Sequence, residues 1–450
     1  MGWLKEWFSR LLQRHPAVLR SLFRLAEPLL TRRQLFSRAR DVKDIFDRPH
    51  DFQVGFTIAP KTKLGPFLLS MDEGPRHTIE KRALARAIDR PFATQFARTA
   101  KHESDAIAAQ LAREARNDQP IDLASNYAER VFVRTLARYF GIPVDGWASQ
   151  HLQVPPGERT LALFIRTLGA TIGCGTHPAP FGLEELALAV SEEFKRQLEI
   201  AIENRRADID ETVLGYLFHP RPDQHDLDPQ RVIDDAQYVQ QDGLARSIGG
   251  LLAAGASLPK LFSGVLYELS QHKQLEALVR KAGDAQLSDA DWKTFVEPYV
   301  LEALRFRPAF PLLIRYCPRA ARIGDTEVPA GSDLGFSPLA AMFDPTYVER
   351  PDQFIPGRPE DRYFIFGAGP RTCLGRSMML GLLAPMLRSL FIHLPAIATA
   401  PPGSFRYDAA ALEHYWVKLP ASQGRLIVLP RRQVANEGEP ETAERSSGSI

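Results

Sequence analysis

Residues 364 to 375 read F-I-F-G-A-G-P-R-T-C-L-G and place Cys373 in a glycine-rich loop just before an apolar helical run. Gly367 and Gly369 permit backbone conformations that residues with a Cβ rarely adopt. A cysteine at the N-terminal end of a helix meets amide N–H groups and the positive end of the helix dipole, which favour the thiolate. The stretch therefore predicts a thiolate that can bind iron, against the alternative of a buried structural thiol.

Two further side chains of this loop suit a metal cofactor. Phe366 can cover one side of the sulfur and limit the access of water. Arg371 can pair with a carboxylate of a bulky cofactor such as a haem propionate. All six fixed positions of F-G-x-G-x-R-x-C-x-G are present, and the stretch resembles the haem-binding loop of the cytochrome P450 family. The resemblance implies that Cys373 is the axial ligand to the iron of haem b and that Arg371 is a propionate partner.

A second motif lies upstream in a helix-like run. Glu302 and Arg305 are three residues apart, so they share one helical face and can form a bidentate ion pair. The pair resembles the E-x-x-R helix of the family, whose implied role is structural support of the haem loop. In the family a third residue, usually Arg or His, joins the pair. Gln353 stands at that place in this sequence, and Arg358 nearby is a possible substitute.

Three more basic side chains are expected at the haem because of the same resemblance. Arg315, at the end of an apolar strand, matches the strand arginine that contacts a haem propionate. Residues 71 to 77 look like the D-x-P-x-H element of the family, lengthened by one residue. His77 is therefore expected to reach a propionate, with Lys81 as the usual basic neighbour four positions later. Without the resemblance, a single His or Arg in these places is ordinarily a surface residue.

The long apolar helix expected from about residue 231 towards 272 departs from the family pattern. Oxygen-activating members carry [AG]-G-x-[DE]-T at its centre, where the acid and the alcohol relay protons to bound dioxygen. Here Ala254-Gly255 is followed by Ser257 in place of the acid and Leu258 in place of the threonine. If the alignment is shifted by one residue, Ser257 replaces the alcohol, but the acid is still absent.

Pro259 lies inside the same helix and has no N–H group, so the carbonyl four residues earlier loses its usual partner. We expect a widened turn whose free Gly255 carbonyl holds a water or a bound oxidant, or else a kink without catalytic meaning. The candidate catalytic residues are Gly255, Ser257 and Pro259. The expected lining of the distal pocket is Ala253, Ala254, Leu258 and residues 160 to 176.

The composition predicts a large hydrophobic core, with 450 residues of which 44% are hydrophobic and 24% charged. Helical periodicity dominates, so we expect a mainly α protein with a small β component, and the resemblance implies the cytochrome P450 fold with haem between the distal helix and the cysteine loop. A single catalytic domain is expected over 1–436, with 1–30 as an amphipathic extension and 437–450 as a disordered tail. The predicted helices are 75–115, 120–141, 182–207, 231–280, 288–306 and 375–393, and the predicted strands are 312–316, 321–323, 326–328 and 425–429.

The net charge and the cysteine content argue against several classes of protein. A net charge of +2 argues against a dedicated nucleic-acid binder. Three widely separated cysteines indicate neither a disulfide framework nor a zinc knuckle, which favours a cytoplasmic location. The N-terminus lacks the apolar run of about 18 residues that a membrane span needs. One helical face there either packs on the domain or lies in a membrane interface, and it carries Trp3, Leu4, Trp7, Phe8, Leu11 and Leu12.

The resemblance implies a haem-thiolate monooxygenase that inserts one oxygen atom from O2 into a hydrophobic small molecule. Electrons would come from a separate ferredoxin or flavodoxin, since no flavin or nicotinamide module is recognisable in the sequence. The altered segment 254–259 leaves open a peroxygenase or a fatty-acid hydroperoxide isomerase, neither of which needs an electron donor. A hypothesis of another class is a non-catalytic haem sensor or carrier, which would bind ligands without turnover.

Overall fold

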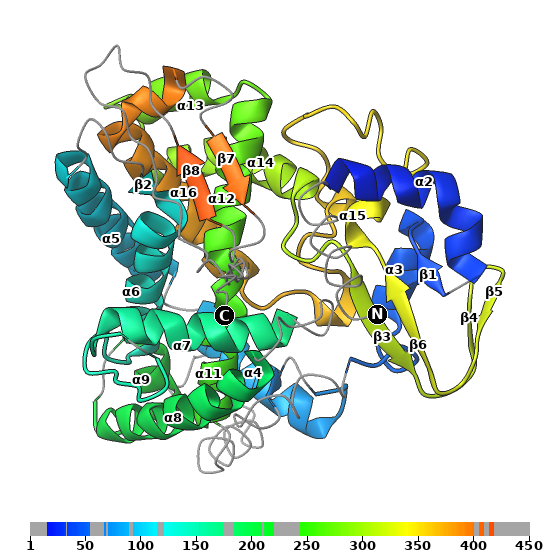
Figure 1. Ribbon diagram of the computed structural model, residues 1–450, viewed down its shortest axis with the longest axis horizontal. Helices are drawn as coiled ribbons and strands as arrows, with labels where there is room; N and C mark the ends of the chain where they lie inside the picture. The colour runs from blue at the N-terminus through cyan, green and yellow to red at the C-terminus, as the bar shows by residue number, and fades with distance from the viewer. Residues whose placement is uncertain are drawn as a thin grey trace, which may run out of the picture.

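The computed structural model describes residues 16–32, 34–54, 67–68, 71–89, 93–114, 121–152, 154–173, 183–208, 211–219, 244–399, 405–408 and 414–417. Figure 1 shows most of the helices gathered on one side and a smaller part, which contains strands β1 and β3 to β6, on the other. The prediction of a mainly helical protein with a small β component is confirmed. The expected strand 425–429, the polar tail and the N-terminal residues before Pro16 lie outside the described residues.

The bounds of the elements are as follows. The α-helices are α2 Pro16–Arg32, α3 Ala39–Asp47, α4 Pro75–Asp89, α5 Ala93–Glu114, α6 Glu129–Phe140, α7 Glu158–Gly173, α8 Leu183–Asn204, α9 Val213–Phe218, α11 Leu244–Ala254, α12 Leu258–Gln271, α13 Leu275–Ala282, α14 Asp289–Phe306, α15 Pro338–Ala341 and α16 Arg376–His393. The short helices are the π-helix η3 Ala124–Ala128 and the 3-10 helices η4 Gly255–Ser257, η5 Glu360–Arg362, η6 Gly369–Arg371 and η7 Pro395–Thr399. The strands are β1 Leu35–Phe36, β2 Ile121–Asp122, β3 Leu313–Cys317, β4 Ala321–Ile323, β5 Thr326–Val328, β6 Ser332–Phe336, β7 Phe405–Asp408 and β8 His414–Val417.

The start of the helix predicted over 120–141 is wrong. Strand β2 occupies its first residues, and the π-helix η3 leads into α6. The Asp122 carboxylate accepts the backbone N–H groups of Ala124 and Ser125 at 2.9 and 3.0 Å, which caps the turn after the strand. The short aspartate side chain therefore ends the strand, and the helical part begins at Ala124, four residues later than predicted.

Three small sheets lie beside the helices. The first has the order β1-β6-β3, with β1 parallel and β3 antiparallel to β6, and it sets Arg315 opposite Leu334. The predicted hairpin of β4 and β5 is confirmed, and its turn uses Gly324 at a φ of 54°. The third sheet has the order β2-β8-β7.

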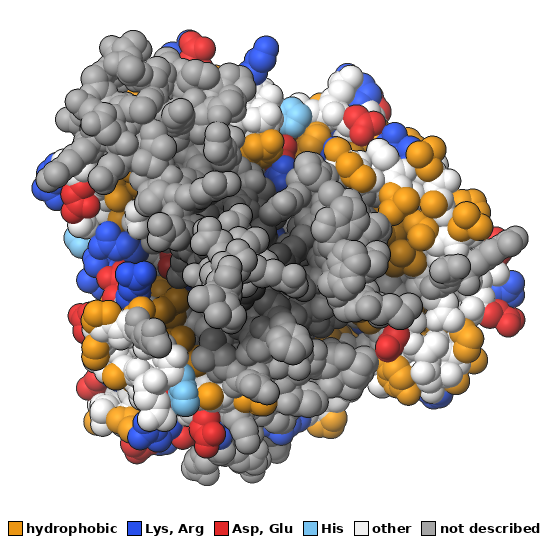
Figure 2. All heavy atoms as spheres, in the orientation of Figure 1, with side chains coloured by type: hydrophobic (Ala, Val, Ile, Leu, Met, Phe, Trp, Pro, Cys, Tyr) orange, Lys and Arg blue, Asp and Glu red, His pale blue; other side chains and the backbone are white. Residues whose placement is uncertain are grey.

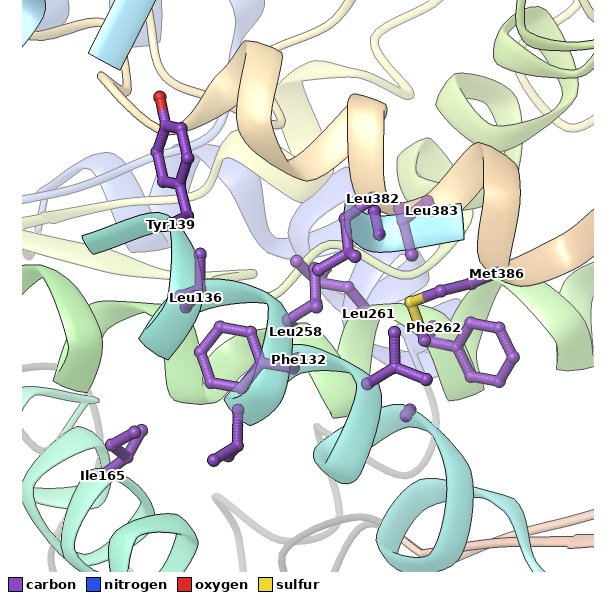
Figure 3. Packing of buried hydrophobic residues seen from close by; sticks show 14 of the residues in the cluster. Phe132, Leu136, Tyr139, Ile165, Leu258, Leu261, Phe262, Leu382, Leu383 and Met386 are labelled. Atoms are coloured by element: carbon purple, nitrogen blue, oxygen red, sulfur yellow. The ribbon is translucent and has the colours of Figure 1, made fainter. Parts of the chain in front are cut away.

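The main hydrophobic core surrounds α12 and α16. Figure 3 shows Phe132 of α6 and Leu258 of α12 in one packed cluster with Met386 of α16. Two buried polar side chains fix α16 within this core, since Tyr127 donates its hydroxyl to the Met386 carbonyl at 2.7 Å and Trp292 donates its indole N–H to the Ala384 carbonyl at 2.8 Å. Such bonds satisfy the polar atoms of otherwise apolar rings.

A second, smaller core joins the sheet β1-β6-β3 to α2, α3 and α15. The chain leading to Cys373 runs between the two cores. Ile365 packs against both, Ala368 against the smaller core, and Phe366 and Leu374 against the larger one. The cysteine loop is therefore held at the junction of the helical part and the strand-containing part.

Among the described residues, one helical run is long and apolar enough to cross a membrane by length and composition. It covers Ser247–Gln271, and 61% of its most apolar window is buried inside the protein. Its side chains pack against α6, α7 and α14 in the larger core. The run has the position of a core helix.

Candidate functional site

The loop before α16 gives Cys373 a defined backbone path. The backbone N–H of Cys373 donates to the Phe366 carbonyl at 2.9 Å, which closes the loop. Gly367 and Gly369 have φ values of 72° and 65°, in the left-handed region that favours glycine. A Cβ at Gly369 would lie 2.9 Å from the Phe46 carbonyl of α3. Glycine therefore allows α3 to pack directly against the cysteine loop.

Two opposing effects act on the pKa of the Cys373 thiol. The side chain is exposed, yet the surrounding protein desolvates the sulfur and raises the pKa of the thiol. The backbone amide of Gly375, at the N-terminal end of α16, lowers that pKa by a smaller amount. The predicted effect of the helix terminus is thus present, but desolvation of the sulfur has the larger effect on the pKa. A metal that binds this sulfur must displace the proton.

Glu302 and Arg305 form the expected ion pair on α14, and both side chains are fully buried. Arg305 Nε donates to Glu302 Oε2 at 3.0 Å, and its Nη2 donates to Oε1 at 2.8 Å. The same guanidinium donates to the carbonyls of Met342 and Gln353 at 3.0 and 3.1 Å. Arg305 therefore ties α14 to the irregular chain that leads to the cysteine loop.

Arg358 supplies the third partner of this pair. Its Nε donates to Glu302 Oε1 at 3.2 Å, and its Nη2 donates to the Gln353 carbonyl at 3.0 Å. Gln353 itself is exposed and contributes its backbone carbonyl. Tyr363 donates its hydroxyl to Glu302 Oε2 at 3.3 Å, and burial together with the Glu302 charge raises the pKa of that hydroxyl. One buried carboxylate thus binds two guanidinium groups and a phenol.

His77 is buried in the first turn of α4 beside Glu73. His77 Nδ1 lies 3.2 Å from Glu73 Oε2, and Arg371 Nε lies 3.3 Å from Glu73 Oε1. Burial lowers the pKa of His77, the charges of Arg371 and Lys81 add to that effect, and Glu73 opposes it. Lys81, expected at a propionate, instead donates its ammonium group to the Pro370 carbonyl of the cysteine loop. That contact ties α4 to the loop backbone.

Arg315 of β3 lies close enough to Arg371 for their charges to interact. Burial lowers the pKa of Arg315 to about 10, Arg371 adds to that effect, and Asp72 opposes it. Arg315 Nη1 donates to the Ile314 carbonyl at 2.9 Å. Burial also lowers the pKa of Arg371, against the charges of Glu73 and Asp72. Two desolvated guanidinium groups in one place are what an anionic ligand requires.

The sequence analysis missed Glu73. This residue lies within 3.3 Å of both His77 and Arg371 and so organises the cationic cluster. The signal was in the spacing, because Glu73-Gly-Pro-Arg-His77 has the D-x-P-x-H pattern with glutamate as the acid. No lengthening of the element is needed when Glu73 takes that place.

The distal helix is interrupted where the sequence suggested. Helix α11 ends at Ala254, the 3-10 turn η4 follows, and α12 begins at Leu258 with Pro259 in its first turn. The Gly255 carbonyl was expected to be free, but it accepts the N–H of Leu258. The 3-10 turn moves the donor from residue i+4, where proline has no N–H, to residue i+3. The prediction of a free carbonyl at Gly255 is therefore wrong.

Close packing accounts for the small residues of this segment. A Cβ at Gly255 would lie 2.5 Å from the ring of Phe132 on α6, and a Cβ at Gly169 of α7 would lie 2.3 Å from Ala256. Leu258 is buried in the cluster that also contains Phe132 (Figure 3). Gly255 and Leu258 thus serve the packing of the distal helix against its neighbours.

Ser257 has a different environment from Leu258. It is half-buried, and its hydroxyl donates to the Ala254 carbonyl at 3.1 Å. Ala253, expected in the pocket, is buried, and its carbonyl packs against Gly169. Of the expected lining over 160–176, residues 160–173 belong to α7, whereas Cys174 and its two successors lie outside the described residues.

Comparison with known proteins identifies the family. The family model for cytochrome P450 matches residues 183–394, a range that contains the Glu302–Arg305 pair and the Cys373 loop. Many solved cytochrome P450 structures share the fold of the described chain. The chain belongs to the cytochrome P450 family.

Three relatives illustrate the range of similarity to this P450. Steroid 17-alpha-hydroxylase/17,20 lyase of Gallus gallus is 32% identical over 175 residues, which cover 34% of each chain. Cyclomarin C epoxidase CymV of Salinispora arenicola is 21% identical over 330 residues, or 72% of each chain. The solved structure of CxnD, a cytochrome P450 enzyme for C–S bond formation in chuangxinmycin biosynthesis, is 19% identical with a TM-score of 0.65, over 88% of this chain and 89% of that one. The chain spans about a third of the length of the first curated relatives that it matches.

Members of the P450 family bind haem, and the side chains of this P450 fit that group. Cys373 offers a sulfur at the junction of the two cores, at the N-terminal end of α16. Arg315 and Arg371 bring two desolvated positive charges to one place, with the buried His77 beside them. Haem carries two propionates, which would offset those charges. The donor set and the charge of the site are therefore compatible with a haem bound through a thiolate.

Proposed function

We propose that this P450 is a haem-thiolate monooxygenase that inserts one oxygen atom from O2 into a hydrophobic small molecule, with electrons from a separate ferredoxin or flavodoxin. The observation that carries the proposal is the Cys373 loop, which is closed onto Phe366 and packed between the two cores. The buried network of Glu302, Arg305 and Arg358 supports the chain that leads to it. The related oxidative enzymes among its relatives support the same class of chemistry.

In this proposal each side chain has a defined task. The Cys373 sulfur binds the haem iron after losing its proton, and Arg371, Arg315 and His77 bind the propionates. Burial lowers the pKa of His77, which favours the neutral ring, and a neutral ring binds a propionate by donating a hydrogen bond. Lys81 acts through the Pro370 carbonyl as a positioning residue for the loop. The bound haem, with its thiolate ligand, supplies the activation of dioxygen.

On the distal side we assign the proton-holding hydroxyl to Ser257. The Ala254 carbonyl accepts its hydrogen bond at 3.1 Å and so orients the oxygen. Leu258 is packed in the core, which favours the alignment in which Ser257 takes the place of the family's alcohol. Gly255 and Pro259 contribute by shape, since they set the 3-10 turn that carries Ser257.

We further propose one catalytic domain over residues 1–436, followed by a tail over 437–450, in the cytoplasm. The cores on both sides of the cysteine loop share Phe354 and Ile365, which supports a single unit around one site. A reducing compartment suits the free thiols of Cys317 and Cys373.

The test is turnover of the haem-loaded protein with a surrogate ferredoxin and ferredoxin reductase, with a panel of hydrophobic compounds under isotopically labelled dioxygen. We expect product that contains one labelled oxygen atom and that requires the reductase. The same turnover without reductase, driven by an organic hydroperoxide and free of label from dioxygen, would contradict the proposal. Cys373→Ala serves as the control that should give no product with either oxidant.

A further inference from the structure

Helix α2 presents an apolar stripe to solvent. Val18, Leu22, Leu25 and Leu29 are 50%, 38%, 84% and 66% exposed, and they recur every three or four residues, so they lie on one side of the helix. Figure 2 shows hydrophobic side chains gathered on the surface over α2. These four residues are half of the eight large exposed hydrophobic side chains among the described residues. A contiguous apolar surface of this kind marks an interaction site more often than scattered single residues do.

The opposite side of α2 is fixed to the protein. Phe23 is 3% exposed in the smaller core. The Arg20 guanidinium lies 3.8 Å from the ring centre of Phe343, and Glu27 pairs with Arg38 at 2.9 Å. These anchors hold the helix in one rotation about its axis. The stripe therefore cannot turn inward to join the core, and it remains available to an external partner.

The sequence just before α2 continues the same pattern. Leu4, Phe8 and Leu11 follow one another at four- and three-residue spacing, and Leu11 lies seven residues before Val18. Trp3 and Trp7 add side chains that prefer the boundary between lipid headgroups and acyl chains. An apolar helical stripe with tryptophans near it in the sequence is typical of a segment that lies in a membrane interface.

The charge of this region indicates which surface it fits. Residues 1–33 contain seven basic and two acidic side chains, whereas the whole chain is nearly neutral at +2. Arg24, beside the stripe on α2, has a half-exposed side chain and lies 3.5 Å from the carboxylate of Asp352, which is itself exposed. A surplus of positive charge attracts anionic lipid headgroups and repels a second copy of the same segment.

From these observations we propose that α2 docks this P450 on an anionic lipid surface. The side chains of Val18, Leu22, Leu25 and Leu29 enter the boundary between headgroups and acyl chains, and the half-exposed Arg24 beside them contacts the headgroups. The contact is peripheral and reversible, because one helical stripe buries little apolar area. This inference is independent of the proposed reaction, since docking requires no turnover.

The experiment is co-sedimentation of the full haem-loaded chain with vesicles of phosphatidylglycerol and phosphatidylcholine in equal parts, and with vesicles of phosphatidylcholine alone. We expect binding to the anionic vesicles that weakens with salt. The Leu25→Asp/Leu29→Asp variant should bind at least about tenfold more weakly, since two of the buried apolar side chains become acidic. Leu25→Gln/Leu29→Gln, a milder change without added charge, should weaken binding in the same direction.

Ile200→Asp/Ile392→Asp is the matched control, because these two exposed isoleucines on α8 and α16 undergo the same chemical change away from α2. It should bind vesicles like the unaltered protein, and unchanged haem spectra and thermal unfolding establish that each variant is folded. Equal binding of the α2 variants and the unaltered protein would overturn the proposal. The proposal would also be overturned if the protein did not bind vesicles and instead formed a dimer that the Leu25→Asp/Leu29→Asp variant does not form. In that case the stripe would bind a second copy of the chain.

Discussion

The buried carboxylate of Glu302 joins several distant parts of the chain. It has no exposed surface and accepts hydrogen bonds from Arg305, Arg358, Tyr363 and the backbone N–H of Ile355. Its negative charge is needed, because the equally buried Arg305 carries the opposite charge. The charge pair has a structural purpose, which is to fasten α14 to the chain before the cysteine loop.

Glu302→Gln should therefore destabilise the protein strongly although it hardly changes the shape of the side chain. Arg305 would be left as a buried cation without its partner, at a cost of about 3–5 kcal/mol. The measurement is the free energy of unfolding in urea. Glu349→Gln is the control, because Glu349 is 82% exposed in its pair with Arg350 and its loss should change stability by less than about 1 kcal/mol. A Glu302→Gln protein as stable as this control would contradict the account.

Gly369→Ala tests the glycine of the cysteine loop. The residue has a φ of 65°, and a Cβ there would lie 2.9 Å from the Phe46 carbonyl, so the change adds a clash to the backbone strain. Gly331→Ala is matched to it, with a φ of 77° and nothing within 4 Å of the added Cβ. The control should cost only the strain, about 1–2 kcal/mol, whereas Gly369→Ala should cost more and also lower the haem content. Equal effects of the two changes would argue against the contact between α3 and the loop.

At the scale of the element, the distal helix owes its form to its neighbours. Its small residues lie against α6 and α7, and the 3-10 turn of η4 accommodates Pro259. The bounds of α14 and α16 could be predicted from sequence, and Ser288 caps α14 by accepting the N–H of Asp291 at 3.1 Å. The partner of the Gly255 carbonyl could not be predicted, because a sequence with Pro259 is compatible with either a free carbonyl or a 3-10 bond.

In the candidate site, too, some contacts could be predicted from the sequence and others could not. The motifs predicted the pairing of Glu302 with Arg305, since residues three apart on a helix must lie together. The bond of Lys81 to the Pro370 carbonyl was not predictable, because it joins α4 to a loop 289 residues away. The raised pKa of the Cys373 thiol was also missed, since desolvation depends on atoms that the local sequence does not name.

Gly169→Ala should push α7 away from the distal helix. The added Cβ would lie 2.3 Å from the Cβ of Ala256 and 2.5 Å from the Ala253 carbonyl, a backbone atom that cannot move alone. We expect a loss of about 1–3 kcal/mol in unfolding free energy and weaker binding of hydrophobic ligands. Gly381→Ala is the control. A Cβ at this helical glycine would lie 3.6 Å from the nearest atoms, on Phe96, so the protein should tolerate the change. Unchanged stability and ligand binding in Gly169→Ala would contradict the packing described.

For the whole molecule, the candidate haem site joins parts that are distant in sequence. His77 comes from α4, Arg315 from β3, and Arg371 and Cys373 from the loop between the two cores. A ligand that binds all of them links the helical part to the strand-containing part. Haem should therefore stabilise the entire chain and not only the loop.

Arg315→Gln should reduce this coupling. It removes a desolvated positive charge from the propionate side of the site, so haem should dissociate faster and raise the temperature of unfolding by less. The measurements are transfer of haem to apomyoglobin and thermal unfolding with and without haem. Arg319→Gln, an exposed arginine just beyond β3, is the matched control and should behave like the unaltered protein. Equal haem transfer from both variants would mean that Arg315 has no contact with the propionates.

The central claim is that Cys373 binds the haem iron through its sulfur. The most direct measurement is the absorption spectrum of the reduced carbon monoxide complex of the haem-loaded protein and of Cys373→Ala. We predict the spectral signature of a thiolate ligand in the unaltered protein and its complete loss in Cys373→Ala. Cys317→Ala, at the other described free cysteine, should retain it. A thiolate signature that survives in Cys373→Ala would contradict the account.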